Sequence, residues 1–147
     1  MKILAQRVSA ASLAVNKKEI ASIDEGIFAL VGFEKEDETS ICKSMIEKLI
    51  NYRIFSDNKG QIEKSLIEIT GSILLVPQVT LALDTKKGSR PNFSQAASPE
   101  LGRKMFNNLI LELKKNENIH LESGLFGAEM EISLVNQGPV TFYFESE

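Results

Sequence analysis

The sequence feature that most limits the fold is a Gly138-Pro139 step inside residues 132–144, a segment that otherwise has the composition of one continuous strand. Proline cannot donate a backbone hydrogen bond to a neighbouring strand, so the backbone groups at this step serve a purpose other than strand pairing. One interpretation is a turn, because glycine and proline are the strongest turn formers. The other is that their carbonyl groups, across a cis bond, face a pocket and bind the donor groups of a ligand.

A second segment favours the ligand interpretation. Residues 73–76 form an uninterrupted apolar run, which is typical of a buried strand. The run continues directly into Pro77-Gln78-Val79-Thr80-Leu81, so an amide and a hydroxyl side chain lie at the end of that strand. The chain therefore carries two short motifs, residues 77–81 and 136–141, that are candidates for a ligand site.

The two motifs, in this order, resemble the signature motifs of the D-aminoacyl-tRNA deacylases. That family usually shows Ser-Gln-x-Thr and, well downstream, Asn-x-Gly-Pro-x-Thr. Either motif alone is weak evidence for this family, but the ordered set is strong evidence. The resemblance extends over nearly the whole chain. It also includes Ala5-Gln6-Arg7-Val8, residues 51–57, residues 84–93, Ala97-Ser98-Pro99 and Ser133-Leu134-Val135-Asn136.

Residue patterns predict a mixed α and β fold. The first three predicted strands read as an antiparallel meander, and Ser98 and Pro99 are expected as the N-cap and first residue of the second of two helices. Together with the resemblance, these patterns predict one α+β domain over residues 1–147, in which antiparallel or mixed sheets form a barrel-like core with two main helices. The predicted strands are residues 2–15, 20–23, 27–33, 73–76, 120–122, 129–136 and 140–145.

Charge and composition limit the function. The formal net charge of −3 argues against broad, nonspecific attraction to nucleic acid. A small basic rim beside one pocket is still expected from Lys86, Lys87, Arg90, Arg103 and Lys104, although each of these is equally typical of a solvated loop or surface. The first residues lack a long apolar segment, so neither a signal peptide nor a membrane span is expected, and the predicted location is the cytoplasm.

The usual catalytic side chains are scarce. His120 is the only histidine and Cys42 the only cysteine, and neither lies near a motif that would make it a nucleophile or a base. No set of His, Cys and carboxylates has zinc-ligand spacing, and no glycine-rich phosphate loop is present. We therefore expect a protein that works without a metal or a cofactor.

The resemblance implies a mechanism that uses main-chain groups. Water cleaves the ester between the amino acid and the terminal ribose of D-aminoacyl-tRNA, and the ribose 2′-hydroxyl assists. Backbone N–H groups of Gln78, Val79 and Thr80 are the expected donors to the oxyanion. Thr80 is either a nucleophile or a residue that fixes the strand end, and the absence of a visible general base favours the second role.

Selection of the D form is implied by the Gly-Pro motif. The carbonyls of Gly138 and Pro139 accept hydrogen bonds from the substrate's α-ammonium and leave no room for an L side chain, so glycyl-tRNA is also expected as a substrate. The resemblance places this segment in the partner subunit's site, which implies a homodimer.

Further residues are expected around the substrate. Arg7 either holds the Gly-Pro segment or faces the surface, and Asn136 belongs to the same motif as the Gly-Pro step. Phe93 and Met130 either line a pocket for the terminal adenine or are plain core residues.

The chain departs from the usual motif at Pro77, where most family members have serine. An animal-type branch with relaxed preference toward certain L-aminoacyl-tRNAs also carries Pro-Gln-x-Thr-Leu, and its Gly-Pro bond is trans. Because Arg7 and residues 136–141 follow the bacterial-type pattern, we predict a cis Gly138-Pro139 bond. Two alternatives remain: an animal-type editing deacylase, and a noncatalytic nucleic-acid-binding protein.

Overall fold

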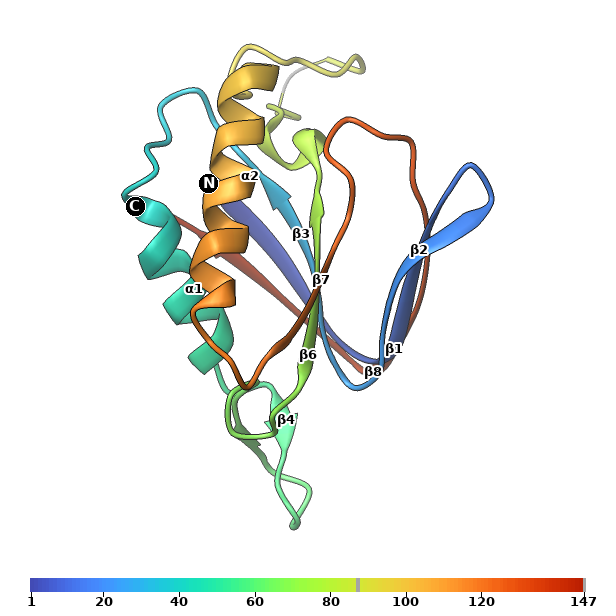
Figure 1. Ribbon diagram of the computed structural model, residues 1–147. Coiled ribbons are helices and arrows are strands. Elements are labelled where there is room, and N and C mark those ends of the chain that lie inside the picture. Colours follow the sequence, from blue (N-terminus) through green and yellow to red (C-terminus); the bar gives the residue numbers. More distant parts are fainter. Residues whose placement is uncertain (87, 147) are drawn as a thin grey trace.

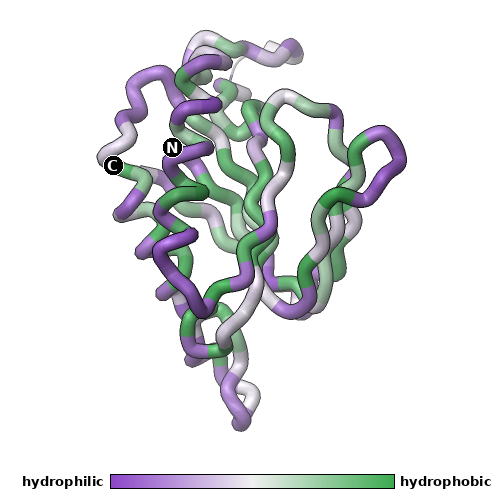
Figure 2. The backbone as a smooth tube through the Cα atoms, in the orientation of Figure 1, coloured by the Kyte–Doolittle hydropathy of each residue, from purple (hydrophilic) through white to green (hydrophobic). Residues whose placement is uncertain are grey.

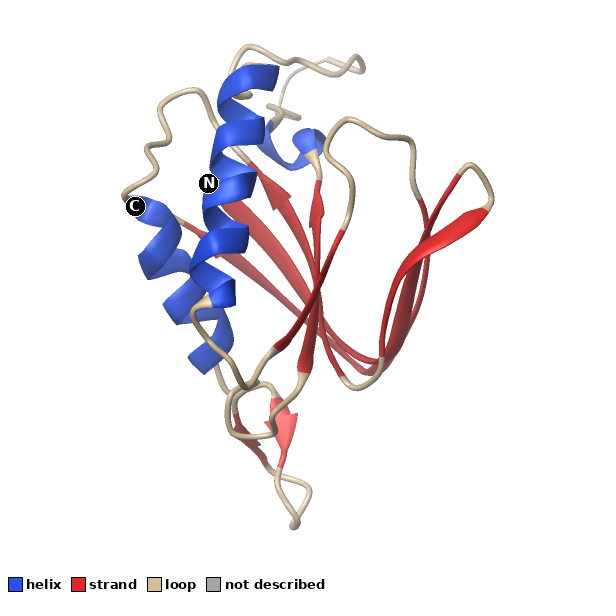
Figure 3. Cartoon of the chain, in the orientation of Figure 1, coloured by secondary structure: helices blue, strands red, loops and turns tan. Residues whose placement is uncertain are grey.

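A curved mixed sheet with two helices on one of its faces makes up the fold (Figures 1 and 3). A computed structural model describes residues 1–86 and 88–146, so Lys87 of the expected basic rim lies outside the described residues. The helices are α1 (Ile41–Asn51), α2 (Pro99–Lys114) and the short 3-10 helix η1 (Val79–Ala82). The strands are β1 (Lys2–Val15), β2 (Lys18–Ile23), β3 (Gly26–Gly32), β4 (Phe55–Ser56), β5 (Ile62–Lys64), β6 (Ser72–Pro77), β7 (His120–Ser123) and β8 (Glu131–Glu145).

Strand β1 organises the sheet. Its first half pairs with β3 and its second half pairs with β2, while β8 runs antiparallel along its other edge. The expected meander is therefore wrong, because β3 pairs with β1 and not with β2. A strand of 14 residues is long enough to curve and to serve two partners in succession. This curvature brings the sheet close to a closed barrel, which confirms the predicted fold class.

The strands β3, β6 and β7 form the parallel part of the sheet. The connection from β3 to β6 contains α1, and the connection from β6 to β7 contains α2, as parallel pairing requires. The carboxyl ends of the three strands consequently lie at one edge of the sheet.

Strand β6 is apolar on both faces because two clusters cover it. Ile73 and Leu75 belong to the core beneath the helices, and Leu74 and Val76 belong to a second cluster on the other face. Figure 2 shows the hydrophobic residues following the strands, whereas the β1–β2 turn is hydrophilic. A short continuous apolar run is the pattern expected for such a doubly covered strand.

Both predicted helices are present, and α2 begins where expected. The Ser98 hydroxyl accepts a hydrogen bond from the Leu101 N–H (3.2 Å), and Pro99 is the first helical residue. The apolar stripe of α2, with Met105 and Leu109, packs into the core. None of the helices in residues 1–86 and 88–146 is long and apolar enough to cross a membrane.

The C-terminal segment is one strand, not the two strands expected. β8 stays paired with β1 on both sides of the Gly-Pro step, but its register shifts there, so that Val8 pairs with Asn136 and Gln6 with Thr141. Residues 137–140 therefore bulge out opposite Arg7, and the chain does not turn back. The Gly138–Pro139 bond is cis, as predicted.

Candidate active site

A cavity of about 750 Å³ opens at the edge where the parallel strands end. Phe33 follows β3, Pro77 ends β6, and Phe126 follows β7; all three line the cavity, together with the first residue of α2, Pro99. Ligands of open parallel sheets bind outside the carboxyl ends of the strands, because the loops and helix N-termini converge there. Position and volume both suit a small-molecule or nucleotide-sized group.

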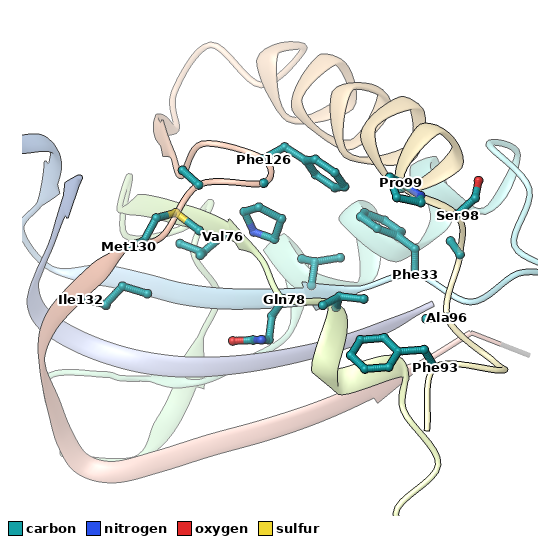
Figure 4. A pocket seen from close by; sticks show the side chains of 17 residues that line it. Phe33, Val76, Gln78, Phe93, Ala96, Ser98, Pro99, Phe126, Met130 and Ile132 are labelled. Carbon is teal, nitrogen blue, oxygen red and sulfur yellow. The ribbon is translucent and has the colours of Figure 1, made fainter. Parts of the chain in front are cut away.

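The walls of the cavity are largely apolar and aromatic. Figure 4 shows Phe33, Phe93 and Phe126 around the opening, with Met130 on the side of β8. Phe93 has 56% of its surface exposed although it is a large apolar residue. Exposed aromatic faces in a cavity are suited to stack against a planar ring such as a nucleobase.

Glycine at position 102 brings α2 close to one of these rings. A Cβ at Gly102 would lie 3.0 Å from Cζ of Phe126, so a larger residue would displace the ring. The guanidinium of Arg103, also on α2, lies over the same Phe126 ring, 5.0 Å from its centre. The cavity wall and the surface of α2 are thus joined through Phe126.

The strand-end motif supplies the polar groups. The Gln78 N–H donates to the Val31 carbonyl (2.7 Å) and is committed to the sheet, so it is not a free donor as the sequence had suggested. Val79 and Thr80 open η1, where the first N–H groups have no acceptor within the helix. These two backbone groups remain the candidate oxyanion donors.

The side chain of Thr80 is held by a hydrogen bond from Gln78. The Gln78 side-chain amide donates to the Thr80 hydroxyl (2.5 Å), and Thr80 does not line the cavity. The hydroxyl therefore has the geometry of a group that fixes the start of η1. Pro77, at the position where serine is usual, lines the cavity with neither a hydroxyl nor an N–H.

The structure divides the predicted site residues into two groups. Pro77, Gln78, Val79, Phe93 and Met130 line the cavity together. The other five, Thr80, Arg7, Asn136, Gly138 and Pro139, do not line the cavity of their own chain.

Sequence reasoning missed Phe33, Phe126 and Gly102. Phe33 directly follows β3, Phe126 lies three residues after the end of β7, and Gly102 lies in the first turn of α2. Phe33 is the last residue of the predicted strand 27–33 and Phe126 lies four residues beyond the predicted strand 120–122, so the available signal was an aromatic residue at or beyond a predicted strand end.

Four residues of the second group, Arg7, Asn136, Gly138 and Pro139, lie at a clamped bulge in β8, whereas Thr80 lies in η1. Arg7 Nε donates to the Gln137 carbonyl (3.0 Å) and Nη1 donates to the Ile54 carbonyl (3.0 Å), so the half-buried Arg7 is paired with the bulge and does not simply face the surface. Asn136 closes the other side, because its Oδ1 accepts from the Val140 N–H (2.8 Å). Between these contacts, Gly138 and Pro139 are exposed.

The remaining reactive side chains lie elsewhere. Cys42 is buried, and burial raises the pKa of its thiol to about 11. His120 is exposed, with Nε2 3.2 Å from a carboxylate oxygen of Glu122. Within the described part of the chain no three His, Cys, Asp or Glu side chains are grouped so that they could hold a metal ion.

Comparison with known proteins finds relatives over nearly the whole chain. Residues 4–145 match the family model described as D-Tyr-tRNA(Tyr) deacylase. The chain is 46% identical over 145 residues to a D-aminoacyl-tRNA deacylase of Ectopseudomonas mendocina (strain ymp), with 99% of each chain covered. It is 47% identical over 140 residues to the D-aminoacyl-tRNA deacylase of Legionella pneumophila (strain Corby), covering 95% of this chain and 96% of the relative.

Solved structures show the same fold. A protein named c-Myc DNA Unwinding Element Binding Protein superposes with a TM-score of 0.93 at 36% identity, covering 100% of this chain and 99% of the other. A probable eukaryotic D-amino acid tRNA deacylase superposes with a TM-score of 0.87 at 18% identity, covering 97% of each chain, which shows the fold alone. Since a family model spans residues 4–145 and relatives of nearly half-identical sequence span the whole length, the chain belongs to the D-Tyr-tRNA(Tyr) deacylase family.

Proposed function

We propose that the chain is an enzyme that hydrolyses the ester bond of D-aminoacyl-tRNA and releases the free amino acid and tRNA. It performs chiral proofreading in the cytoplasm, where aminoacyl-tRNA is used for translation. The observation that carries this proposal is the identity of 46% to a D-aminoacyl-tRNA deacylase over 99% of both chains. The cavity with its aromatic walls and strand-end donors gives the activity a physical site.

In this mechanism the terminal adenosine stacks in the cavity and presents the ester to the strand-end motif. Water adds to the carbonyl carbon, and the oxyanion accepts hydrogen bonds from the N–H groups of Val79 and Thr80. Each such donor accelerates acyl transfer by roughly 10²- to 10³-fold. The ribose 2′-hydroxyl assists the attacking water, and the ribose 3′-oxygen leaves with a proton. Gln78 and the Thr80 hydroxyl hold the donors in position.

The chirality filter is assigned to the Gly-Pro bulge of a second subunit. In a single chain Gly138 and Pro139 are exposed and do not line the cavity, which supports a role for their carbonyls in the site of another chain. Exposed apolar residues near the cavity and on β8, including Phe93, Ile132 and Val135, are suited to be covered by such a partner. The filter binds the α-ammonium and excludes L side chains, so glycyl-tRNA mischarged on a noncognate tRNA is also a substrate.

One assay tests the activity. Sub-stoichiometric protein is mixed with D-tyrosyl-tRNA and L-tyrosyl-tRNA, and the deacylation of each is followed over time. Multiple turnovers on the D form alone support the proposal. If the protein instead hydrolyses L-alanine attached to a noncognate tRNA and leaves D-tyrosyl-tRNA uncleaved, it has the animal-type activity, the alternative suggested by Pro77. Binding without turnover would assign a nucleic-acid-binding role, as the name of one structural relative indicates for that protein.

A mixing experiment tests the composite site. The Gly138→Ala variant disables the filter, and Gly102→Leu blocks the cavity by displacing Phe126. Each homodimer is then inactive, but a heterodimer contains one intact cavity beside one intact bulge. Recovery of up to about a quarter of wild-type activity after the two variants are unfolded and refolded together supports the composite site, since random pairing makes half of the dimers mixed and each mixed dimer has one working site. No recovery with mixed dimers present would place both parts in one chain.

A further inference from the structure

Two surface depressions border the cavity, and they differ in charge. One lies on α2, occupies about 550 Å³, and is lined by Pro99, Glu100, Arg103, Lys104, Asn107 and Asn108. We call these six residues the α2 surface. Pro99 lines both this depression and the main cavity, so the two are adjacent. Anything that leaves the cavity past Pro99 arrives on the α2 surface.

The α2 surface presents donors in two parallel rows, with one N–H of the Asn108 amide donated to the Lys104 carbonyl (2.8 Å). Arg103 and Asn107 are four residues apart, and so are Lys104 and Asn108, which places each cation beside an amide on the helix. Among the ion pairs of residues 1–86 and 88–146, none includes Arg103 or Lys104. Both cations are exposed and available to an anion from outside.

Two features set the strength and position of these charges. Glu100 is the one carboxylate of the α2 surface. It lies in the first turn of α2, where the helix dipole stabilises a negative charge. The Arg103 guanidinium is held over the Phe126 ring, which also lines the cavity. A contact to Arg103 is therefore made close to the cavity mouth.

The depression beyond η1 has a different balance of charge. It occupies about 660 Å³, and its lining includes the carboxylates of Glu34, Asp84 and Glu145 against the ammonium groups of Lys2 and Lys86. Lys2 is already paired with Glu34 (3.1 Å) and Glu145 (3.7 Å). Among the described lining residues the carboxylates outnumber the ammonium groups here, whereas the cations outnumber the carboxylate on the α2 surface, so a polyanion is favoured on the α2 side.

Resting on the proposed function, we propose that the α2 surface binds the sugar-phosphate backbone of the substrate's acceptor end, so that the tRNA leaves the cavity across α2 and not across η1. Arg and Lys bind phosphate oxygens, and Asn side chains bind phosphate and sugar; such contacts position a nucleic acid without reading its sequence. This also explains how a chain of net charge −3 holds a polyanion, because the cations are concentrated at one exit of the site.

The test compares two substrates of one reaction. The double variant Arg103→Gln/Lys104→Gln is assayed on D-tyrosyl-tRNA and on the minimal substrate 3′-O-D-tyrosyladenosine, which has no phosphate. We expect kcat/KM on the tRNA to fall about tenfold, through KM, and the slope of its logarithm against log salt concentration to weaken by about 1 to 2. Hydrolysis of the minimal substrate stays at the wild-type rate.

Two further variants sharpen the result. Lys114→Gln/Lys115→Gln removes the same two charges from the far end of α2 and leaves both substrates unaffected. Glu100→Gln removes the carboxylate and lowers KM for the tRNA, so the effect has the opposite sign. Wild-type kinetics of the Arg103/Lys104 variant on tRNA, or an equal loss on both substrates, would overturn the proposal.

A binding measurement separates this inference from the proposed function. Fluorescence anisotropy with deacylated tRNA reports the surface alone, and we expect weaker binding by the Arg103/Lys104 variant whether or not the wild type turns over. Absent turnover by the wild type counts against the deacylase activity. Equal tRNA binding by wild type and variant counts against the α2 surface.

Discussion

Arg7 Nε donates a hydrogen bond to the Gln137 carbonyl at 3.0 Å, directly before the Gly138–Pro139 bond. The same guanidinium donates from Nη1 to the Ile54 carbonyl, also at 3.0 Å. One planar group from β1 thus ties the bulge in β8 to the segment before β4. The position of the bulge depends on both contacts being made at once.

The first prediction replaces this planar group while keeping its charge. In Arg7→Lys a single ammonium cannot span both carbonyls as the fork of arginine does, so the bulge is less firmly placed. We expect kcat/KM on D-tyrosyl-tRNA to fall by about 10²-fold, the size of effect that a small misplacement of a site group produces. Steady-state deacylation measures this. The matched control is Arg53→Lys, which should keep full activity because the pair that Arg53 forms among the described residues is an exposed one with Glu63. Full activity of Arg7→Lys would show that the contact is dispensable.

The second prediction concerns crowding at the tip of the bulge. Gly138 has φ +139°, and a Cβ there would lie 2.8 Å from the Val140 side chain and 3.0 Å from the Arg7 guanidinium. Gly138→Ala should lose about 1 to 3 kcal/mol of unfolding free energy and nearly all deacylation. Both are measured on one preparation, by denaturant titration and by D-tyrosyl-tRNA hydrolysis.

Gly60 is the control for that substitution. Its φ is also positive, +78°, but nothing lies within 4 Å of a Cβ there. Gly60→Ala therefore places an alanine at a positive φ, which costs conformational free energy, but it creates no steric clash. This variant should keep wild-type activity. Equal activity of the two alanine variants would remove the Gly-Pro bulge from the mechanism.

The third prediction separates backbone from side chain at the strand end. Val79→Pro removes one N–H at the first position of η1, where proline is tolerated and where Gln78 is already extended (φ −142°, ψ 92°). The deacylation rate should fall by roughly 10²- to 10³-fold, the loss of one oxyanion donor. Thr80→Ala keeps the backbone and should stay within about tenfold of wild type. If the alanine variant is folded and almost inactive, a covalent role for the hydroxyl replaces the water mechanism.

Local patterns predicted the elements whose causes are local. The N-cap Ser98 and the Pro99 start of α2 follow from short-range chemistry, and both were correct. The apolar run at residues 73–76 was correctly assigned as a strand, since a run of this length suits a strand covered on both faces and is too short for a typical helix.

Contacts between segments far apart in the chain could not be predicted from the sequence in the same way. The choice of β1 over β2 as the partner of β3 depends on the curvature of a 14-residue strand, and no residue type encodes it. The contact of Arg7 with the Ile54 carbonyl joins segments 47 residues apart through a backbone acceptor, which every residue has. The pairing of the Gln78 N–H with Val31 is equally invisible in the sequence, and it alone removed one of the three expected oxyanion donors.

The last prediction uses Cys42, the only cysteine, as a probe of the core. Burial on the inner face of α1, against α2, raises the pKa of its thiol from 9.0 to about 11, so the folded protein holds this proton more tightly than the unfolded chain does. The resulting stabilisation is complete below pH 9 and is lost as the pH rises from 9 to 11, by about 2 to 3 kcal/mol in full. The difference in unfolding free energy between wild type and Cys42→Ala, measured by denaturant titration, should therefore be constant below pH 8 and shrink above pH 9. A thiol reagent at pH 8 should react only after unfolding, and since Cys42 does not line the cavity, Cys42→Ala should keep the deacylase activity. Rapid labelling of the native protein would show that α1 opens and exposes the core far more often than its packing indicates.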